Sequence, residues 1–268
     1  MILFKSENDI KGIEKAGKVV AEVLDEVASI IRHGLPVEDI EKLVRTIISD
    51  WNARAAFLNY QPPGMRLKFP YATCVSVNEE VVHGFPRGKV LKKGDLVKVD
   101  VGVELGGYYA DAARTYVVEE FLSKEDEELF RAGLGALQKA VELCKPGNTT
   151  GTIGEMIWNY AHSKGFGVVT SYTGHGVGFE IHEDPEVPNF GKDGEGELLV
   201  EGMVIAIEPM LTHGSGDVRV KRDGWTVVTV EGKRAVHFEY TVAVTRGGGK
   251  VLTPWKCEML QDARGEAM

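Results

Sequence analysis

VKVDVGVELGGYYADAARTY, the stretch from Val97 to Tyr116, decides the fold. It consists of two β-prone runs on either side of Leu105-Gly106-Gly107, and this pattern predicts an antiparallel hairpin. If Leu105-Gly106 is the two-residue loop, Asp100 and Asp111 lie directly opposite one another, with their Cβ atoms about 5 Å apart.

Two carboxylates in this position need compensation, because like charges directly opposed on a strand pair are destabilising. A shared proton, an arginine or a metal ion can supply that compensation. Two alternatives stay open on the hairpin alone. Either the register differs, or both side chains are solvated and Arg114 is their partner.

Carboxylates recur in β-prone segments of the second half of the chain. Glu208 ends the apolar run that begins at Met203, and Glu239 lies inside the run that begins at Ala235. Acidic residues are depleted in strands, and a buried unpaired carboxylate is strongly unfavourable. Two such acids in each half therefore indicate a functional site.

Three histidines are candidates for the same site. His175 stands between glycines, where the backbone and a ligand can approach closely, His182 follows it, and His83 lies in the first half. Carboxylates with a few imidazoles and no thiolate suit Mn, Fe(II), Co or Zn. Three further histidines are interpreted as surface or core residues: His33, His162 and His213.

The hydrophobic pattern divides the chain into two halves of the same design. Residues 10–31 and 37–51 have helical periodicity, and β-prone segments follow over about 54–118. A capping box of Ser123 and Asp126 then predicts a helix to Leu143, a helix over 153–160 comes next, and β-prone segments occupy 167–252. This order predicts an α+β protein with one catalytic domain over 1–268 and a pattern repeat at about 8–118 and 123–253.

The composition is that of an ordinary globular protein, with 43% hydrophobic and 26% charged residues among 268. The formal net charge of −9 argues against a specific nucleic-acid partner, and we interpret the basic run Arg87–Lys93 as a solvated loop. No apolar run approaches the ~20 residues of a membrane-spanning helix. An early charged N-terminus and three cysteines without paired spacing predict a cytoplasmic protein.

Several motifs follow one another along the chain: Cys74-Val-Ser-Val-Asn-Glu-Glu-Val-Val-His83, Val99-Asp100 to Asp111, Gly174-His175-Gly, His182-Glu-Asp-Pro, Ala206-Ile-Glu208-Pro, Asp223-Gly-Trp225 and Phe238-Glu239. In order and spacing they resemble the methionine aminopeptidases of the short bacterial type I form, over nearly the full chain. The resemblance implies a pita-bread fold. In that fold two pseudo-symmetric halves, each with helices packed on a curved antiparallel sheet, enclose a dinuclear metal site.

The resemblance also implies roles for individual residues. Two divalent ions (Co, Mn, Fe(II) or Zn) would be held by Asp100, Asp111, His175, Glu208 and Glu239, with Asp111 and Glu239 touching both. A water or hydroxide that bridges the ions would attack the peptide bond, and Glu208 would accept its proton. His83 and His182 would contact the substrate without binding metal.

The activity implied by the resemblance is removal of the initiator methionine from nascent proteins whose second residue is small. The partners would be nascent polypeptide N-termini. A transient contact of Arg87–Lys93 with the ribosome is a further hypothesis, no membrane partner is expected, and a monomer is the default.

Selectivity for methionine requires an apolar slot, and contacts between sulfur and aromatic rings suit that task. The resemblance places the walls of this slot at Phe57, Tyr60, Phe69, Cys74 and Trp225. Phe57 and a further candidate, Met210, are equally compatible with core packing. Three departures from the family pattern are a longer link at 61–68, Ile181 where an aromatic is common, and Tyr240 where many relatives have histidine.

Three other interpretations compete with this one. A pita-bread peptidase that acts on bonds to proline would cleave Xaa-Pro peptides instead of Met-Ala peptides. A catalytically silent binding protein would bind no divalent metal. An esterase or phosphatase with two metal ions would show no turnover on peptides.

Overall fold

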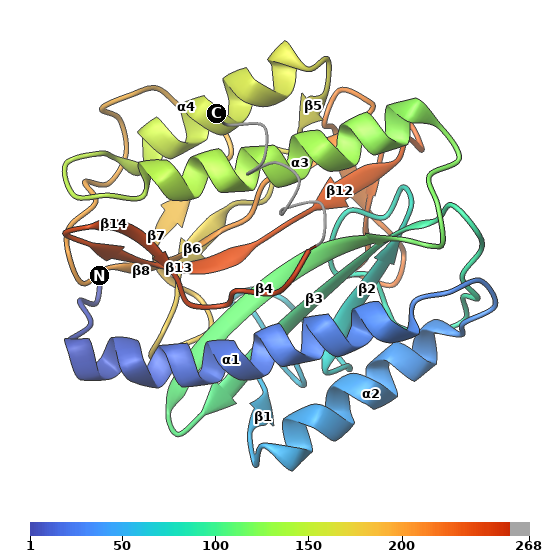
Figure 1. Cartoon of the computed structure of the whole chain (residues 1–268), viewed down its shortest axis with the longest axis horizontal. Coiled ribbons are helices and arrows are strands. Elements are labelled where there is room, and N and C mark those ends of the chain that lie inside the picture. The colour runs from blue at the N-terminus through green and yellow to red at the C-terminus, as the bar shows by residue number, and fades with distance from the viewer. Residues whose placement is uncertain (258–268) are drawn as a thin grey trace.

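The computed structural model describes residues 1–257, in which two pairs of helices enclose the strands (Figure 1). Helices α1 (Glu7–Ile30) and α2 (Val37–Asp50) cover the strands of the first half, and α3 (Lys124–Leu143) and α4 (Thr150–Ser163) cover those of the second. The predicted helix pairs are therefore confirmed. None of the helices within residues 1–257 combines the length and the apolar character needed to traverse a bilayer.

Side-chain caps start α1, α3 and α4, and the cap of α3 differs from the prediction. Ser6 and Asp9 form a capping box at α1, but at α3 only half of the predicted box exists. Ser123 Oγ accepts the Asp126 N–H at 3.1 Å, whereas the Asp126 carboxylate accepts from Arg234 at 2.8 Å. The charged guanidinium is a stronger partner for a carboxylate than a backbone N–H is.

Each half contributes one main antiparallel sheet. In the first half β3 (Leu96–Leu105) pairs with β1 (Arg54–Ala55), β2 (Thr73–Val77) and β4 (Tyr108–Val117). In the second half the strands lie in the order β14 (Gly248–Val251), β13 (Tyr240–Thr245), β8 (Val204–Ile207), β6 (Gly174–Gly176) and β7 (Glu183–Val187). The α+β architecture predicted from the hydrophobic pattern is therefore present.

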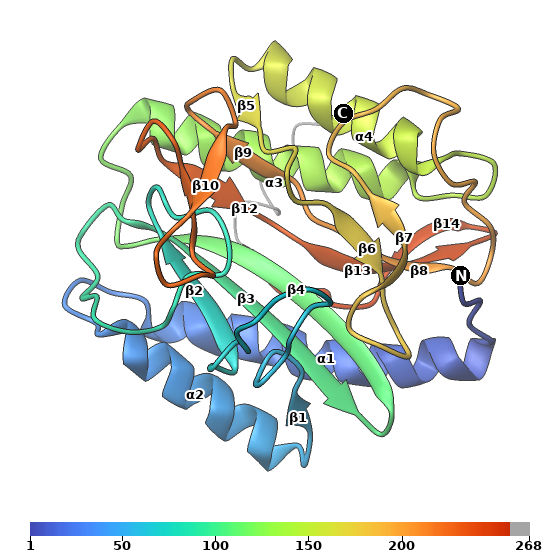
Figure 2. The ribbon, with the colours of Figure 1, turned by 180° about the vertical axis from the view of Figure 1, so that it is seen from behind.

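Two smaller sheets complete the second half. One contains β12 (Ala235–His237), β9 (Met210–Thr212) and β5 (Gly167–Val168), and the other contains β10 (Val218–Val220) and β11 (Val227–Thr229). Seen from behind, β10 lies beyond the end of β2 (Figure 2). The N–H of Val81, which follows β2, donates to Val227 O at 2.8 Å, so this small sheet is joined to the first half.

The predicted register of the β3–β4 hairpin is wrong by two residues. Leu105 pairs with Tyr108, so the loop is Gly106-Gly107, and Asp100 and Asp111 lie opposite Ala113 and Gly102. Gly106 and Gly107 have φ values of 63° and 88°, and such tight hairpin loops require positive φ at both positions. Because side chains alternate with a period of two residues, both aspartates still lie on the same face of the sheet.

Strands β4 and β13 join the two halves at the centre of the molecule (Figure 1). Thr241 Oγ1 accepts the N–H of Asp111 at 3.1 Å and donates to Asp111 O at 2.7 Å. The N–H of Glu239 donates to Ala113 O at 2.9 Å. These bonds set the position of one acidic residue from each half relative to the other.

Candidate metal centre

The predicted site residues come from both sheets. Asp100 lies on β3, Asp111 on β4 and His175 on β6, while Glu208 directly follows β8. Glu239 was predicted inside a strand but lies in the break between β12 and β13. All of them line one cavity of about 910 Å³, together with His83, His182, Phe57, Tyr60, Phe69, Cys74 and Trp225.

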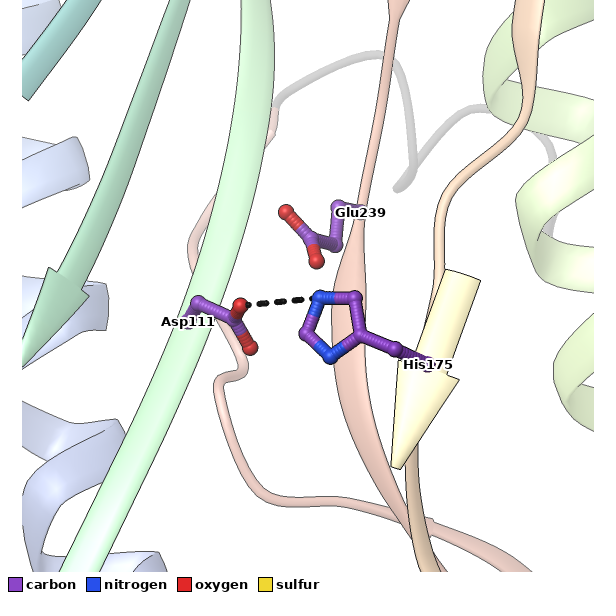
Figure 3. Close-up of side chains that lie close together, drawn as sticks. All are labelled: Asp111, His175 and Glu239. Atoms are coloured by element: carbon purple, nitrogen blue, oxygen red, sulfur yellow. Dashed lines mark ion pairs between the residues drawn. The ribbon is translucent and has the colours of Figure 1, made fainter. Parts of the chain in front are cut away.

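Three of these side chains form the core of the cluster. One ligand-type atom from each of Asp111, His175 and Glu239 lies within 4.8 Å of the others, and the three side chains point toward one another (Figure 3). His175 Nε2 is 3.4 Å from Asp111 Oδ2 and 3.8 Å from Glu208 Oε1. The two halves of the chain therefore bring carboxylates to a single imidazole.

The electrostatics of the cluster favour a bound cation. Burial raises the pKa of Asp100 and of Glu239 well above the ordinary carboxyl value, and the neighbouring carboxylates, Asp111 first among them, raise it further. Asp100 Oδ1 is buried and has no hydrogen-bond partner among residues 1–257. A divalent ion would neutralise the repulsion between these groups and satisfy the unpaired oxygen, so the donor set fits a metal.

The backbone carbonyl of the next residue orients the His175 ring. Its Nδ1 lies 2.9 Å from Gly176 O, which leaves Nε2 directed at the carboxylates. Burial by itself would lower the pKa of His175, but Asp111 and then Glu208 raise it to about 9. A carbonyl acceptor on the other ring nitrogen is the usual way in which proteins orient a histidine that binds metal.

The other two predicted histidines lie at the cavity without entering the cluster. Burial, and then nearby His237, lower the pKa of His83 to about 4. The His182 ring faces the cavity, 4.3 Å from the His175 ring and 4.9 Å from the Tyr60 ring. Desolvation, and then His175, lower the pKa of His182. Both rings are therefore neutral near pH 7 and can form hydrogen bonds without carrying a charge.

An apolar pocket adjoins the cluster. Phe57, Phe69, Cys74 and Trp225 pack together, with Tyr60 at their edge, and the Phe69 and Trp225 rings lie 5.2 Å apart. Met210 belongs to a different apolar cluster, in the core with Val81, Val82 and Val169. The core-packing alternative is therefore the one that the structure favours for Met210.

The departures from the family pattern also have defined places. Within the 61–68 link, Pro62, Pro63 and Met65 line the cavity. The link is closed at its base, where the Phe69 N–H donates to Tyr60 O at 2.8 Å. Ile181 packs with the pocket aromatics. The buried Tyr240 ring lies 4.7 Å from the Trp255 ring.

Sequence reasoning missed one residue of this region, His237. Its Nε2 lies 3.2 Å from Glu208 Oε2, and its side chain is 1% exposed. A signal for it was present, because residues two apart in an extended segment point to the same side, and His237 precedes Glu239 by two. The prediction of the site treated Glu239 alone and did not apply this periodicity.

Comparison with known proteins defines the class. The sequence model of metallopeptidase family M24 matches residues 11–246, and the chain belongs to that family. A methionine aminopeptidase of Clostridium perfringens is 41% identical to it over 253 residues, which cover 94% of this chain and 99% of the relative. Within family M24, the chain is thus a member of the methionine aminopeptidases.

Solved structures agree with this assignment. A methionine aminopeptidase from Thermotoga maritima superposes with a TM-score of 0.89 at 46% identity, covering 94% of this chain and 99% of that one. A prolidase from Pyrococcus horikoshii reaches only 0.76 at 28% identity, and this chain covers 65% of it. The pita-bread fold and the metallo-aminopeptidase class expected from the sequence motifs are therefore confirmed.

Proposed function

We propose that the protein removes the N-terminal methionine of newly made polypeptides whose second residue is small, with two divalent metal ions at the centre described above. This proposal rests on one observation, which is that a single cavity contains both a possible metal site and an apolar pocket. A buried group of carboxylates and one imidazole meets an apolar pocket with aromatic walls.

The ions would be held by oxygen and nitrogen donors from both halves. Asp100, Asp111, His175, Glu208 and Glu239 would be the ligands, and all five line the same cavity. Mn, Fe(II), Co and Zn all suit this donor set. When bound, such ions polarise the scissile carbonyl and lower the pKa of a water molecule toward neutrality.

The protein's own side chains would carry out the remaining steps. Glu208, whose side chain is 13% exposed at the cavity, would accept a proton from the attacking water and pass it to the leaving amine. His182 would donate a hydrogen bond to the carbonyl oxygen as negative charge develops there, and His83 would contact the amide. Both roles need uncharged imidazoles, which the lowered pKa values provide.

Selectivity would follow from the depth of the apolar pocket. Phe57, Tyr60, Phe69 and Trp225 would enclose the methionine side chain, and Cys74 would lie at its base as a neutral thiol. Burial raises the pKa of that thiol well above its ordinary value. An aromatic enclosure accepts a flexible thioether through many weak sulfur–ring contacts.

The cellular setting belongs to the same proposal. We place the enzyme in the cytoplasm as a monomer with one catalytic domain, acting on nascent chains, with the ribosome as a transient partner of Arg87–Lys93. Two charges of that run have internal partners, since Lys89 Nζ is 2.6 Å from Glu80 Oε2 and Lys93 Nζ is 2.9 Å from Glu120 Oε1. If Arg87→Glu together with Lys92→Glu leaves ribosome co-sedimentation unchanged, the ribosome contact is refuted.

A peptide-cleavage assay tests the activity. The protein is first freed of metal, and Mn, Fe(II) or Co is then added in separate reactions. We expect release of methionine from Met-Ala-Ser and no cleavage of Ala-Pro-Ser. Cleavage of the proline peptide alone would instead indicate a prolidase-like enzyme, and no turnover with any metal would indicate a binding protein.

Calorimetric titration tests the metal centre independently of turnover. We expect two ions to bind each chain, and His175→Ala and Asp111→Asn to abolish at least one of them. His162→Ala is the matched control because that histidine is exposed and lies on α4, so it should leave the stoichiometry unchanged. One ion per chain in the wild-type protein would refute the dinuclear proposal.

A further inference from the structure

His237 has an imidazole that is buried next to Glu208. Its side chain is 1% exposed, and neither ring nitrogen makes a hydrogen bond to any residue in the described part of the chain. Its Nε2 approaches Glu208 Oε2 at 3.2 Å, but this contact lacks hydrogen-bond alignment. Buried polar groups in proteins are normally paired, so an unpaired imidazole at this place calls for an explanation.

The backbone of His237 is fixed on both sides. Its N–H donates to Thr115 Oγ1 at 3.0 Å, and Thr115 Oγ1 donates to His237 O at 2.7 Å. His237 also pairs with Met210 at the end of β12. The backbone of His237 is therefore held by two strands, one from each half, and its 1% exposed ring is enclosed by its neighbours.

The Glu208 carboxylate has few other restraints. Its backbone carbonyl accepts from Asn189 Nδ2 at 3.1 Å, but that bond leaves the side chain free to rotate. Oε1 faces His175 Nε2 at 3.8 Å, beyond hydrogen-bonding distance, and Oε2 faces His237. The distance between His237 Nε2 and Glu208 Oε2 is already within the hydrogen-bonding range, so only the alignment of the two groups has to change.

We infer that His237 is a positioning residue, which donates its Nε2–H to Glu208 Oε2 and so holds the other carboxylate oxygen toward the metal centre and the substrate. The inference rests on the role proposed above for Glu208. A carboxylate that must both contact a metal and accept a proton benefits when one oxygen is fixed, because the free rotor otherwise samples unproductive orientations.

A purely structural role for His237 makes the opposite prediction. If the ring only fills space in the core, leucine should replace it without functional loss and with equal or greater stability, since an unpaired polar group is removed. The two roles are therefore separable by replacing the N–H donor while keeping the volume similar.

Two substitutions make the test. His237→Gln keeps an N–H donor, and we expect kcat and metal affinity within about three-fold of wild type. His237→Leu removes the donor, and we expect kcat to fall about 10- to 100-fold with KM nearly unchanged, and the affinity for Mn(II) measured by calorimetry to fall about ten-fold. The Leu variant should melt at or above the wild-type temperature.

His213→Leu is the matched control. His213 Nε2 bonds to Asp126 Oδ1 at 3.1 Å near the start of α3, and His213 does not line the cavity. This variant should lose stability without a change in kcat or in Mn(II) affinity. A fall in kcat that followed melting temperature in both Leu variants would overturn the inference.

Other outcomes also decide the matter. Wild-type kcat and metal affinity in His237→Leu would overturn the inference, and so would equal losses in the Gln and Leu variants, because the donor would then be irrelevant. If the wild-type protein releases no methionine with any metal, the proposed function fails, while the calorimetric comparison of the His237 variants still tests the positioning role.

Discussion

Removal of one partner from the buried ion pair of Lys5 and Glu183, at the wall of the substrate cavity, should destabilise the protein strongly. Lys5 Nζ pairs with the Glu183 carboxylate, and the two side chains are 1% and 3% exposed. Glu183 Oε1 also accepts the N–H groups of Phe179 and Glu180, at 2.6 and 2.9 Å. The Lys5 charge thus balances the negative charge of Glu183, whose carboxylate binds the backbone of the turn before His182.

Lys5→Met should lower the free energy of unfolding by about 3–5 kcal/mol, because it keeps the apolar stem but leaves the Glu183 charge buried without its partner. Lys250→Met is the matched control, since Lys250 pairs with Glu14 at 3.0 Å and the two side chains are 48% and 32% exposed. Its loss should stay below about 1 kcal/mol. Urea unfolding followed by circular dichroism measures both differences.

The double variant Lys5→Met/Glu183→Gln separates the charge effect from packing. Glutamine still accepts the Phe179 and Glu180 N–H groups but carries no charge, so the double variant should be more stable than Lys5→Met alone. A loss below about 1 kcal/mol for Lys5→Met, or a double variant less stable than the single one, would refute the reasoning.

Three further outcomes are expected. Gly102→Val should lower kcat/KM for Met-Ala-Ser at least ten-fold, because a Cβ at Gly102 would lie only 2.7 Å from the Phe57 ring in the pocket wall. In the β3–β4 loop, Gly106→Asn should be nearly neutral in urea unfolding, whereas Gly107→Val should cost about 1–2 kcal/mol, because a β-branched residue tolerates positive φ poorly. The third outcome concerns pH. The pKa of His83 is about 4 in the folded protein and about 6.5 when unfolded, so the unfolded chain binds more protons between these values. In metal-free protein the His83 imidazole should therefore contribute a loss of up to about 3 kcal/mol as pH falls from 6.5 to 4, measured as the difference between the urea-unfolding pH profiles of wild type and His83→Asn.

The sequence predicts the helices and the acidic residues of the site well. Apolar residues at helical spacing and the cap at Ser123 are local signals, so α1 to α4 could be found without tertiary information. The unusual carboxylates at Asp100, Asp111 and Glu208 were equally visible, because an acid at such a place conflicts with strand propensity.

Local patterns did not predict which hydrogen-bond or ion-pair partner a polar side chain takes. The Asp126 side chain was expected to cap its own helix, yet it bonds to Arg234, which is 108 residues away in sequence. Period-two spacing places His237 on the same side as Glu239, but local patterns do not predict its contacts with Glu208 and Thr115. Which of several possible partners a polar group takes depends on contacts between segments that are far apart in sequence.

The error in the hairpin register shows why the site could still be found. A shift of one residue would have turned Asp111 away from Asp100, but the actual shift of two keeps both on one face. The aspartates then meet diagonally across the strand pair, and Asp111 is placed against Glu239 by the bonds that Thr241 and Ala113 make across the halves. The spacing between the acids is therefore set by backbone bonding between β4 and the β12–β13 break, so repulsion among the carboxylates cannot open the cluster without breaking those bonds. Such a scaffold keeps the backbone of Asp111 and that of Glu239 close together, so that both carboxyl groups can face one cation.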